Sequence, residues 1–409
     1  MSRVEILIDR AGPLVRAAVV DDGRLTDLQI DRADRPSQVG DIVLGRVDRI
    51  VTALNAAFID IGGPTAGFLG ASDLRQPGAA SRKEARAGSA RIGTRLRTGQ
   101  PVLVQVRADA VGDKGAALTM DVTLPGRFLV LAPFAPGIVL SRRLAQGEAR
   151  GRLTTLVAGL TAGLTRAPAG WIVRAGALDA PAERLSAEAE GLAMAWRAVE
   201  AAAEAGPAPR VLRTGASAAL RTVIEQGGRP LDRIIVGDPA CHAELTEWCT
   251  QAAPDLADRI ERYDGGARPL FERYDLDGEI ARLIGRRVPL PGGGSLVVDR
   301  TEALTVIDVN GGERPNVLAT NLDAAAEIAR QLRLRSVGGI VIVDFINMAD
   351  RRDQQRVLDA LAQAVAGDPA ATHVYGMSKL GLVELTRARR GPALADLLRP
   401  GLPTDTEIS

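Results

Sequence analysis

Histidine and cysteine are scarce in this sequence, and their scarcity excludes several kinds of active site. His242 and His373 are the only histidines among 409 residues, and Cys241 and Cys249 are the only cysteines. A Ser-His-Asp triad would need one of the two histidines, and neither lies in a recognisable setting. Two histidines cannot make a His-rich metal site, and the cysteine spacing fits no zinc motif. No zinc is therefore expected.

Long apolar runs and an excess of charge of one sign are also missing. No run approaches the length of a transmembrane helix, and nothing indicates secretion, so the cytoplasm is the expected compartment. The formal net charge of +1 gives no global attraction to nucleic acid, so any such binding must use local basic patches. With 46% hydrophobic and 25% charged residues, a chain of this length is globular and has several domains.

Two short apolar runs that each end in an aspartate are the most informative feature that is present. Residues 303–308 end at Asp308, and residues 339–344 end at Asp344. β-Branched runs of this length, bounded by glycine and polar residues, predict buried strands. Between them, residues 320–333 carry apolar side chains at helical spacing, and Thr320 or Asn321 is expected to cap that helix.

A strand, a helix and a strand of this size predict a βαβ crossover with two parallel strands. Asp308 and Asp344 would then lie at the same carboxyl edge, where open α/β sheets bind their ligands. Neighbouring strands are about 4.8 Å apart, so the two carboxylates could share one divalent cation. Asn310 would face the same side as Asp308. Oxygen ligands of this kind suit Mg²⁺ or Mn²⁺.

An alternative interpretation assigns these aspartates to local structure. An aspartate after a strand often caps the next helix or closes a turn. Asp344 could do so ahead of a helix that begins near Asp350.

Residues 39–124 contain short β segments that are separated by turns, a pattern that predicts a small barrel. This segment holds Phe58 and Phe68, and aromatic side chains on one face of a barrel can stack the bases of single-stranded nucleic acid. Lys114, one of three lysines, stands in a glycine loop and could contact a phosphate. The alternative is that both rings simply fill the barrel.

At this level of detail the chain resembles the ribonuclease E/G family of bacterial endoribonucleases, from near residue 1 to about Leu398. Matching segments in the N-terminal half are residues 45–50, 56–58, 67–69 and 115–119. The most specific matches are residues 307–310, residues 319–335 and residues 342–346.

The resemblance implies a mixed α+β and α/β chain with several domains. An RNase H-like domain is expected at residues 1–36 and 208–276, split by an S1-type (OB-type) barrel at 37–125 and a 5′-sensor-like domain at 126–207. A DNase I-like catalytic domain is expected at 277–399, followed by a disordered tail at 400–409. Family members use Mg²⁺ to cut single-stranded, AU-rich RNA.

Individual residues match the motifs of the family. Asp308 and Asp344 match its metal-binding aspartates, and Asn310 matches the neighbouring amide of the catalytic site. Phe58, Phe68 and Lys114 match the positions that grip RNA. The residues that match the family's pocket for a 5′-monophosphate are Gly126, Val130, Arg142 and Arg174.

The chain departs from the family pattern at several points. Ala175 follows Arg174 where the family has threonine, so weaker dependence on the 5′ end is expected. Asn347 stands where the family commonly has an acidic residue, and the loop from Gly311 to Leu318 is short. A Cys-Pro-x-Cys element is missing, so a monomer or dimer is expected and not a zinc-linked tetramer.

These features leave two functions open and weaken a third. The first is a Mg²⁺-dependent endoribonuclease of RNA decay or rRNA processing, which leaves 5′-phosphate and 3′-hydroxyl ends. The second is an RNA-binding or ribosome-assembly protein of the same fold with weakened catalysis, which the departures favour. A nucleotide-cofactor enzyme is disfavoured, because the glycines at 292–294 predict a hairpin turn and no glycine-rich loop connects a strand to a helix.

Overall fold

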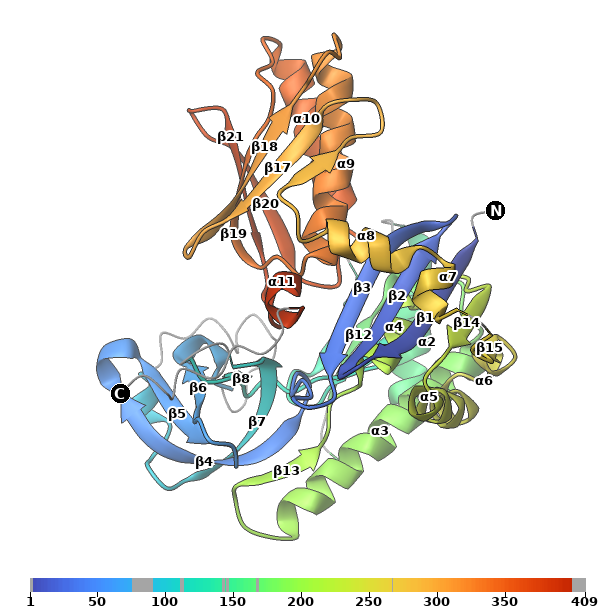
Figure 1. Ribbon diagram of the computed structural model, residues 1–409. Coiled ribbons are helices and arrows are strands. Elements are labelled where there is room, and N and C mark those ends of the chain that lie inside the picture. The colour runs from blue at the N-terminus through green and yellow to red at the C-terminus, as the bar shows by residue number, and fades with distance from the viewer. Residues whose placement is uncertain are drawn as a thin grey trace. The chain divides into compact units, whose positions relative to one another are not determined.

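The computed structural model describes residues 3–75, 91–110, 114–141, 144, 147–166, 169–266 and 268–398 (Figure 1). The chain divides into two compact units. The first contains Met1–Ala33, Asp232–Pro239 and Glu261–Ser409, and the second contains Asp34–Leu231 and Ala240–Ile260. Among the described residues, no helix has the length and apolarity needed to cross a membrane. The tail predicted at 400–409 lies outside the described residues.

The first unit contains a five-stranded sheet, here called the β1 sheet, with the order β15-β14-β1-β2-β3. Its strands are β1 (Val4–Ala11), β2 (Leu14–Asp21), β3 (Arg24–Arg32), β14 (Arg233–Val236) and β15 (Ile260–Arg262). The strands β1, β2 and β3 form an antiparallel meander, and β14 is parallel to β1. Apolar side chains of α7 (Leu270–Arg273) and α8 (Leu276–Arg282) pack with the strands in one core.

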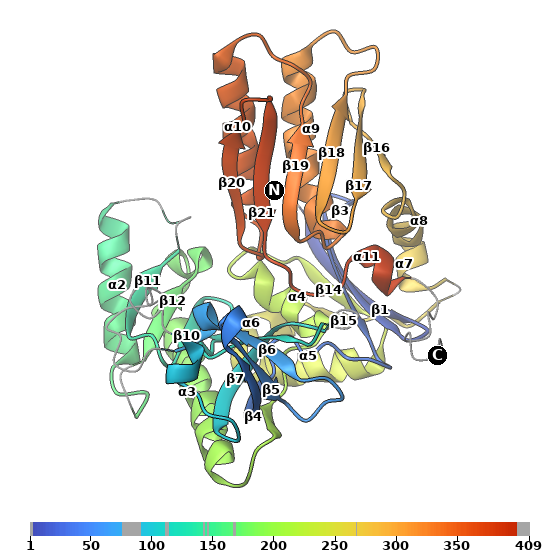
Figure 2. The same cartoon turned by 90° about the vertical axis from the view of Figure 1, so that its left-hand side faces the viewer.

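The other sheet of this unit, the β18 sheet, has six strands in the order β16-β17-β18-β19-β21-β20. Its strands are β16 (Arg287–Pro289), β17 (Ser295–Arg300), β18 (Leu304–Asn310), β19 (Gly339–Asp344), β20 (Thr372–Met377) and β21 (Leu382–Arg387). The helices α9 (Val317–Leu334) and α10 (Arg351–Val365) lie along the same face of this sheet (Figure 2). The short helix α11 (Leu394–Leu397) follows β21 in sequence.

The strand–helix–strand unit predicted from the sequence is confirmed, but its helix cap was predicted wrongly. The helix begins three residues earlier than expected, because the side chain of Asn316 accepts a hydrogen bond from the Ala319 N–H at 3.0 Å. Thr320 and Asn321 lie inside the helix and are fully buried. A polar residue near the start of an apolar pattern can cap the helix or face inward, and periodicity alone does not separate the two.

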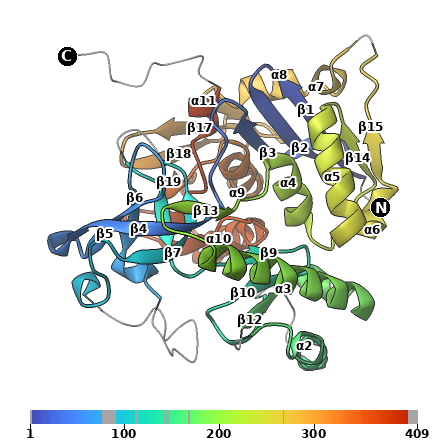
Figure 3. The ribbon, with the colours of Figure 1, turned by 90° about the horizontal axis from the view of Figure 1, so that it is seen from below.

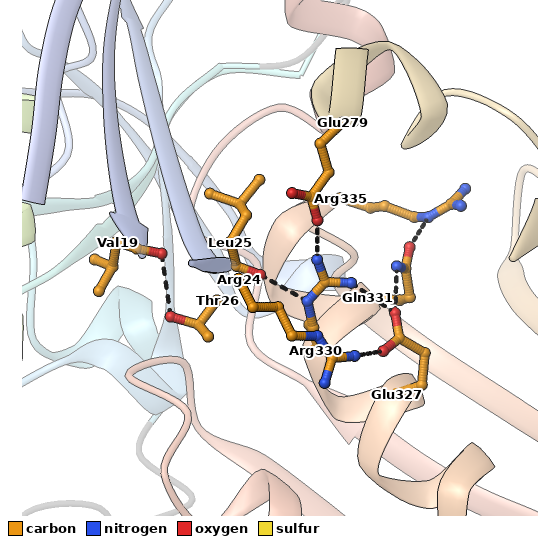
Figure 4. A network of polar contacts seen from close by, with 9 residues as sticks. All are labelled: Val19, Arg24, Leu25, Thr26, Glu279, Glu327, Arg330, Gln331 and Arg335. Carbon is orange, nitrogen blue, oxygen red and sulfur yellow. Dashed lines mark hydrogen bonds and ion pairs between the residues drawn. The ribbon is translucent and has the colours of Figure 1, made fainter. Parts of the chain in front are cut away.

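A polar network joins α9 to β3 and α8 within the first unit (Figure 4). Arg330 donates to the Leu25 carbonyl at 2.6 Å and to Glu327 at 2.8 Å, and it also pairs with Glu279. Gln331 donates to the same Glu327 and accepts from Arg335. Glu327 is only 3% exposed, so these partners satisfy a carboxylate that would be costly to bury alone.

The second unit contains a closed barrel of five strands, in which β4 pairs with both β5 and β7. Its strands are β4 (Ile42–Val51), β5 (Ala56–Asp60), β6 (Gly67–Gly70), β7 (Pro101–Ala108) and β8 (Ala117–Thr119). A further strand, β13 (Arg210–Arg213), pairs with the first residues of β4. The predicted small barrel is therefore confirmed.

A four-stranded sheet with the order β11-β12-β10-β9, the β10 sheet, belongs to the same unit. It consists of β9 (Leu124–Pro125), β10 (Leu129–Ala132), β11 (Gly137–Leu140) and β12 (Gly170–Val173). The helices α2 (Glu148–Thr161) and α3 (Ala182–Glu204) share its core, and α3 is the long helix in Figure 3. The described residues also form α4 (Ala218–Gln226), α5 (Pro239–Ala252) and α6 (Pro254–Ala257).

The mixed α and β composition with several sheets agrees with the predicted fold class at that level. The RNase H-like, 5′-sensor-like and DNase I-like assignments and their boundaries stay predictions.

Candidate metal edge and RNA-contacting residues

Two aspartates occupy the last paired positions of two neighbouring parallel strands. In the ladder between β18 and β19, Asp308 is the register partner of Asp344. Both side chains are exposed, whereas Ile307 and Val343 point into the core beneath the helices. The predicted arrangement of the two carboxylates at one edge is therefore confirmed. Backbone pairing places their Cα atoms about 4.8 Å apart.

Asn310 extends the same face of β18 beyond Asp308. Its side-chain amide donates to Oδ2 of Asp308 at 2.8 Å, which orients that carboxylate. The neighbouring hairpin approaches closely, since a Cβ atom on Gly294 would lie 2.4 Å from the Asn310 carbonyl, and Gly294 has φ +87°. Glycine is thus required at this point of the hairpin that supports the edge.

Asp344 does not serve as a helix cap. The side chain of Asp350 caps α10 by accepting from the Arg352 N–H at 2.8 Å, so the alternative that Asp344 caps this helix is wrong. The loop between Asp344 and Asp350 is held by two side-chain amides. Asn321 of α9 bonds to both backbone groups of Ile346, and Gln354 of α10 donates to the Met348 carbonyl.

The donor set at this edge fits a hard divalent cation. Two carboxylates and one amide supply oxygen ligands, and Mg²⁺ commonly binds one or two carboxylates while keeping several waters. In the part of the chain that the structure describes, no group of three or more acidic, histidine or cysteine side chains is placed to hold a metal. Asn347 is exposed in the loop after Asp344, where an acidic residue would have added charge.

The two barrel phenylalanines lie directly opposite one another on β5 and β6. Their ring centroids are 6.0 Å apart at an interplanar angle of 76°, and Phe68 is 39% exposed. Neither ring belongs to the barrel core, which is formed by residues such as Ala57, Ile59 and Leu69. The alternative that both rings fill the barrel is therefore wrong, and an aromatic pair is available on its outside.

Arg49 is a residue of this face that the sequence interpretation did not single out. Its guanidinium lies 4.8 Å from the centroid of Phe58. The ladder between β4 and β5 shifts register between Val47 and Arg49, so simple alternation along the strand does not predict where Arg49 points.

Lys114 is exposed on the segment that leads into β8. Two residues later, the Ala116 carbonyl accepts a hydrogen bond from the Phe68 N–H at 2.7 Å, so this segment runs beside β6. The structure thus places the lysine on the chain segment that neighbours the aromatic pair. Gly112 and Asp113 of the same loop lie outside the described residues.

Three of the four predicted phosphate-pocket residues meet at one corner of the β10 sheet. Val130 pairs with Ile172, the Gly126 N–H donates to the Leu129 carbonyl, and the Arg174 N–H donates to the Phe128 carbonyl. The guanidinium of Arg174 donates to the Ile224 carbonyl at the end of α4, at 3.1 Å. Arg142 lies outside the described residues.

A buried carboxylate that the sequence interpretation missed holds this corner together. Glu188 of α3 is 7% exposed and accepts from three consecutive N–H groups, those of Arg127, Phe128 and Leu129, at 2.5, 2.9 and 2.9 Å. A Cβ atom on Gly126 would lie 2.5 Å from its Oε1, which explains the glycine. Desolvation raises the pKa of Glu188, while the three donors and the charge of Arg127 act in the opposite direction.

Both cysteines lie on α5 and are buried. Burial raises the pKa of the Cys249 thiol to about 11, so the thiol stays protonated at neutral pH. Neither residue belongs to the sites described above.

The chain is similar to known proteins over nearly its whole length. A family model described as the ribonuclease E/G family matches residues 123–390. The chain is 36% identical over 410 residues to "Ribonuclease G" of Salmonella typhimurium (strain SL1344), which covers 98% of this chain and 83% of the relative. It is 36% identical over 409 residues to "Ribonuclease G" of Escherichia coli (strain K12), with the same coverage. It is also 36% identical over 403 residues to "Ribonuclease E" of Nostoc sp. (strain PCC 7120), covering 95% of this chain and 56% of that protein.

Proposed function

Because the chain belongs to the ribonuclease E/G family and carries two carboxylates at one sheet edge, we propose that it is a divalent-metal-dependent endoribonuclease. The observation that carries the proposal is the in-register pairing of Asp308 with Asp344. Its substrate is single-stranded RNA in RNA decay or rRNA processing, and its partner surface includes Phe58, Phe68 and Lys114.

Asp308 and Asp344 would hold Mg²⁺, or Mn²⁺ in its place, with Asn310 orienting the first carboxylate. A bound divalent cation lowers the pKa of a water molecule and neutralises charge that develops on the scissile phosphate. In-line displacement at phosphorus depends mainly on positioning and electrostatics, so the scarcity of histidine is no obstacle. Attack by water leaves a 5′-phosphate and a 3′-hydroxyl.

The test is cleavage of a short, 5′-labelled, AU-rich single-stranded RNA in Mg²⁺, in parallel with EDTA. We expect Asp308→Asn and Asp344→Asn each to lower the cleavage rate by ~100-fold or more. The matched control is Asp359→Asn, because Asp359 is an exposed aspartate on α10, the helix side of the same sheet. Equal cutting by the parent and both edge variants would refute the mechanism.

A second candidate function is an RNA-binding or ribosome-assembly protein with weakened catalysis. It is favoured by the exposed amide of Asn347 beside an edge with only two carboxylates, and by Ala175 after Arg174. It predicts RNA binding that depends on Phe58 and Phe68 without metal-dependent turnover. Comparing RNAs with 5′-monophosphate and 5′-hydroxyl ends in the same assay would also measure any preference for the 5′ end.

A further inference from the structure

A buried amide on α9 contacts the backbone that follows Asp344. Asn321 is fully buried, and its Nδ2 donates to the Ile346 carbonyl at 2.8 Å, while its Oδ1 accepts from the Ile346 N–H at 3.1 Å. One side chain thus satisfies both polar groups of one residue. An unpaired buried amide is costly, so this pairing strongly favours a single geometry.

The β18 sheet does not supply this restraint by itself. Asp344 is the last residue of β19 that pairs with either neighbour, with Asp308 on one side and Leu382 on the other. Beyond it, Ile346 is held by Asn321 and Met348 by Gln354. The two ladders thus fix Asp344 itself, whereas side-chain amides hold the segment that follows it.

The same helix also begins next to the other half of the edge. Residues 311–316 connect Asn310 to α9, and Asn316 caps the helix while its carbonyl accepts from the Thr320 hydroxyl at 3.0 Å. Asn321 is the next residue. Its contact with Ile346 links the segment after Asp308 and Asn310 to the segment after Asp344.

We propose that Asn321 is a positioning residue that sets the mutual orientation of Asp308 and Asp344 for a divalent cation. The inference rests on the proposed function, because it deepens the same site. Residues that orient metal ligands typically change metal affinity by about 10–100-fold when they are replaced. A residue that served only folding would change stability and leave the affinity of the folded protein unaltered.

Gln331 provides a matched control on the same helix. It is a buried amide, 3% exposed, and it bonds to Glu327 and Arg335 in the network of Figure 4. It lies ten residues further along α9, or about 15 Å at 1.5 Å per residue. Gln331→Ala should cost stability without touching the loop after Asp344.

The experiment measures Mn²⁺ binding by electron paramagnetic resonance on the folded full-length chain, together with Mg²⁺ titrations of cleavage. We expect Asn321→Ala to raise the dissociation constant for Mn²⁺ by about 10–100-fold and to leave the KM for RNA unchanged. Gln331→Ala should bind Mn²⁺ within about twofold of the parent. If Asn321→Ala does not fold, Mn²⁺ binding is measured on Asn321→Asp instead. This variant keeps the size of the side chain and the acceptor for the Ile346 N–H.

Each outcome has one meaning for this inference. Parent-like Mn²⁺ affinity in a folded Asn321 variant overturns it while the metal site stands. Failure of both Asn321 variants to fold, with Gln331→Ala folded, also overturns it, because the role is then structural. A parent that binds no Mn²⁺ refutes the metal-dependent function itself, and the inference with it.

Discussion

Replacing Glu188 by glutamine is expected to destabilise the second unit by about 2 kcal/mol. The glutamine oxygen can keep the two bonds at 2.9 Å, from Phe128 and Leu129, but they lose their charge assistance. The new NH₂ group faces the Arg127 N–H, and one buried donor without an acceptor costs roughly 1–3 kcal/mol. Removal of the buried charge, whose desolvation raises the pKa of Glu188, offsets part of this loss.

The loss of stability in Glu188→Gln can be measured for the whole unit and at individual backbone amides. For a unit of about 200 residues, 2 kcal/mol corresponds to a decrease of roughly 4–8 °C in Tm. Hydrogen exchange of the Arg127, Phe128 and Leu129 amides should accelerate by about 30-fold, since 1.4 kcal/mol is a factor of ten. Glu190→Gln is the matched control, because Glu190 is exposed on the same helix, where its carboxylate accepts from the Ser186 hydroxyl.

Suppose that Glu188→Gln and Glu190→Gln unfold at the same temperature and that the amides of residues 127–129 exchange at parent rates. The Glu188 carboxylate then does not hold the turn formed by residues 127–129. A loss confined to those amides, without a change in Tm, would instead show that the turn opens independently of the rest of the unit.

Three further outcomes are expected. Phe68→Ala should weaken binding of single-stranded RNA by ~1–3 kcal/mol in a filter-binding assay. Leu54→Ala should not, although the Leu54 side chain is apolar and more exposed, at 64%. Lys114→Ala should weaken binding of all sequences alike and reduce the slope of log K against log salt by about 0.7; an unchanged slope would exclude a phosphate contact. Because Cys249 has a folded-state pKa of about 11, its unfolded thiol loses a proton first as pH rises above about 9. Stability should therefore fall between pH 9 and 11, by up to about 3 kcal/mol relative to Cys249→Ala in urea unfolding; parallel curves for the two proteins would contradict this.

Sequence patterns predicted the pairing of Asp308 with Asp344, because that pairing depends on strands. The apolar runs before Asp308 and Asp344 and the helix between them leave few topologies open, and a parallel crossover brings the strand ends together. The barrel was predictable for a similar reason, since short strands and turns recur through residues 39–124. Its open question, whether Phe58 faces inward or outward, needed the register of the strands.

The residues that the sequence did not reveal are polar side chains whose partners lie far away along the chain. Glu188 bonds to residues about sixty positions away, and Asn321 bonds to a residue 25 positions away. Nothing in the local sequence pattern indicates that Glu188 or Asn321 is buried, and asparagine is a residue type that is common at helix N-caps. Arg49 was not predicted, because a bulge in β4 interrupts the alternation of inward-facing and outward-facing side chains.

A metal site at this edge has two physical requirements, the spacing of the two carboxylates and the direction in which they point. The spacing of Asp308 and Asp344 comes from the hydrogen-bond ladder between β18 and β19, which any sequence with good strand propensity would maintain. Asp344 is the last residue of β19 in these ladders, and the loop that follows it is held by Asn321 and Gln354. Apolar substitutions in the core beneath the sheet should therefore lower stability while preserving the spacing. Substitution of the buried amides should change ligand orientation in a sheet that is still intact, so the loss of metal affinity and the loss of stability are separable properties of this fold.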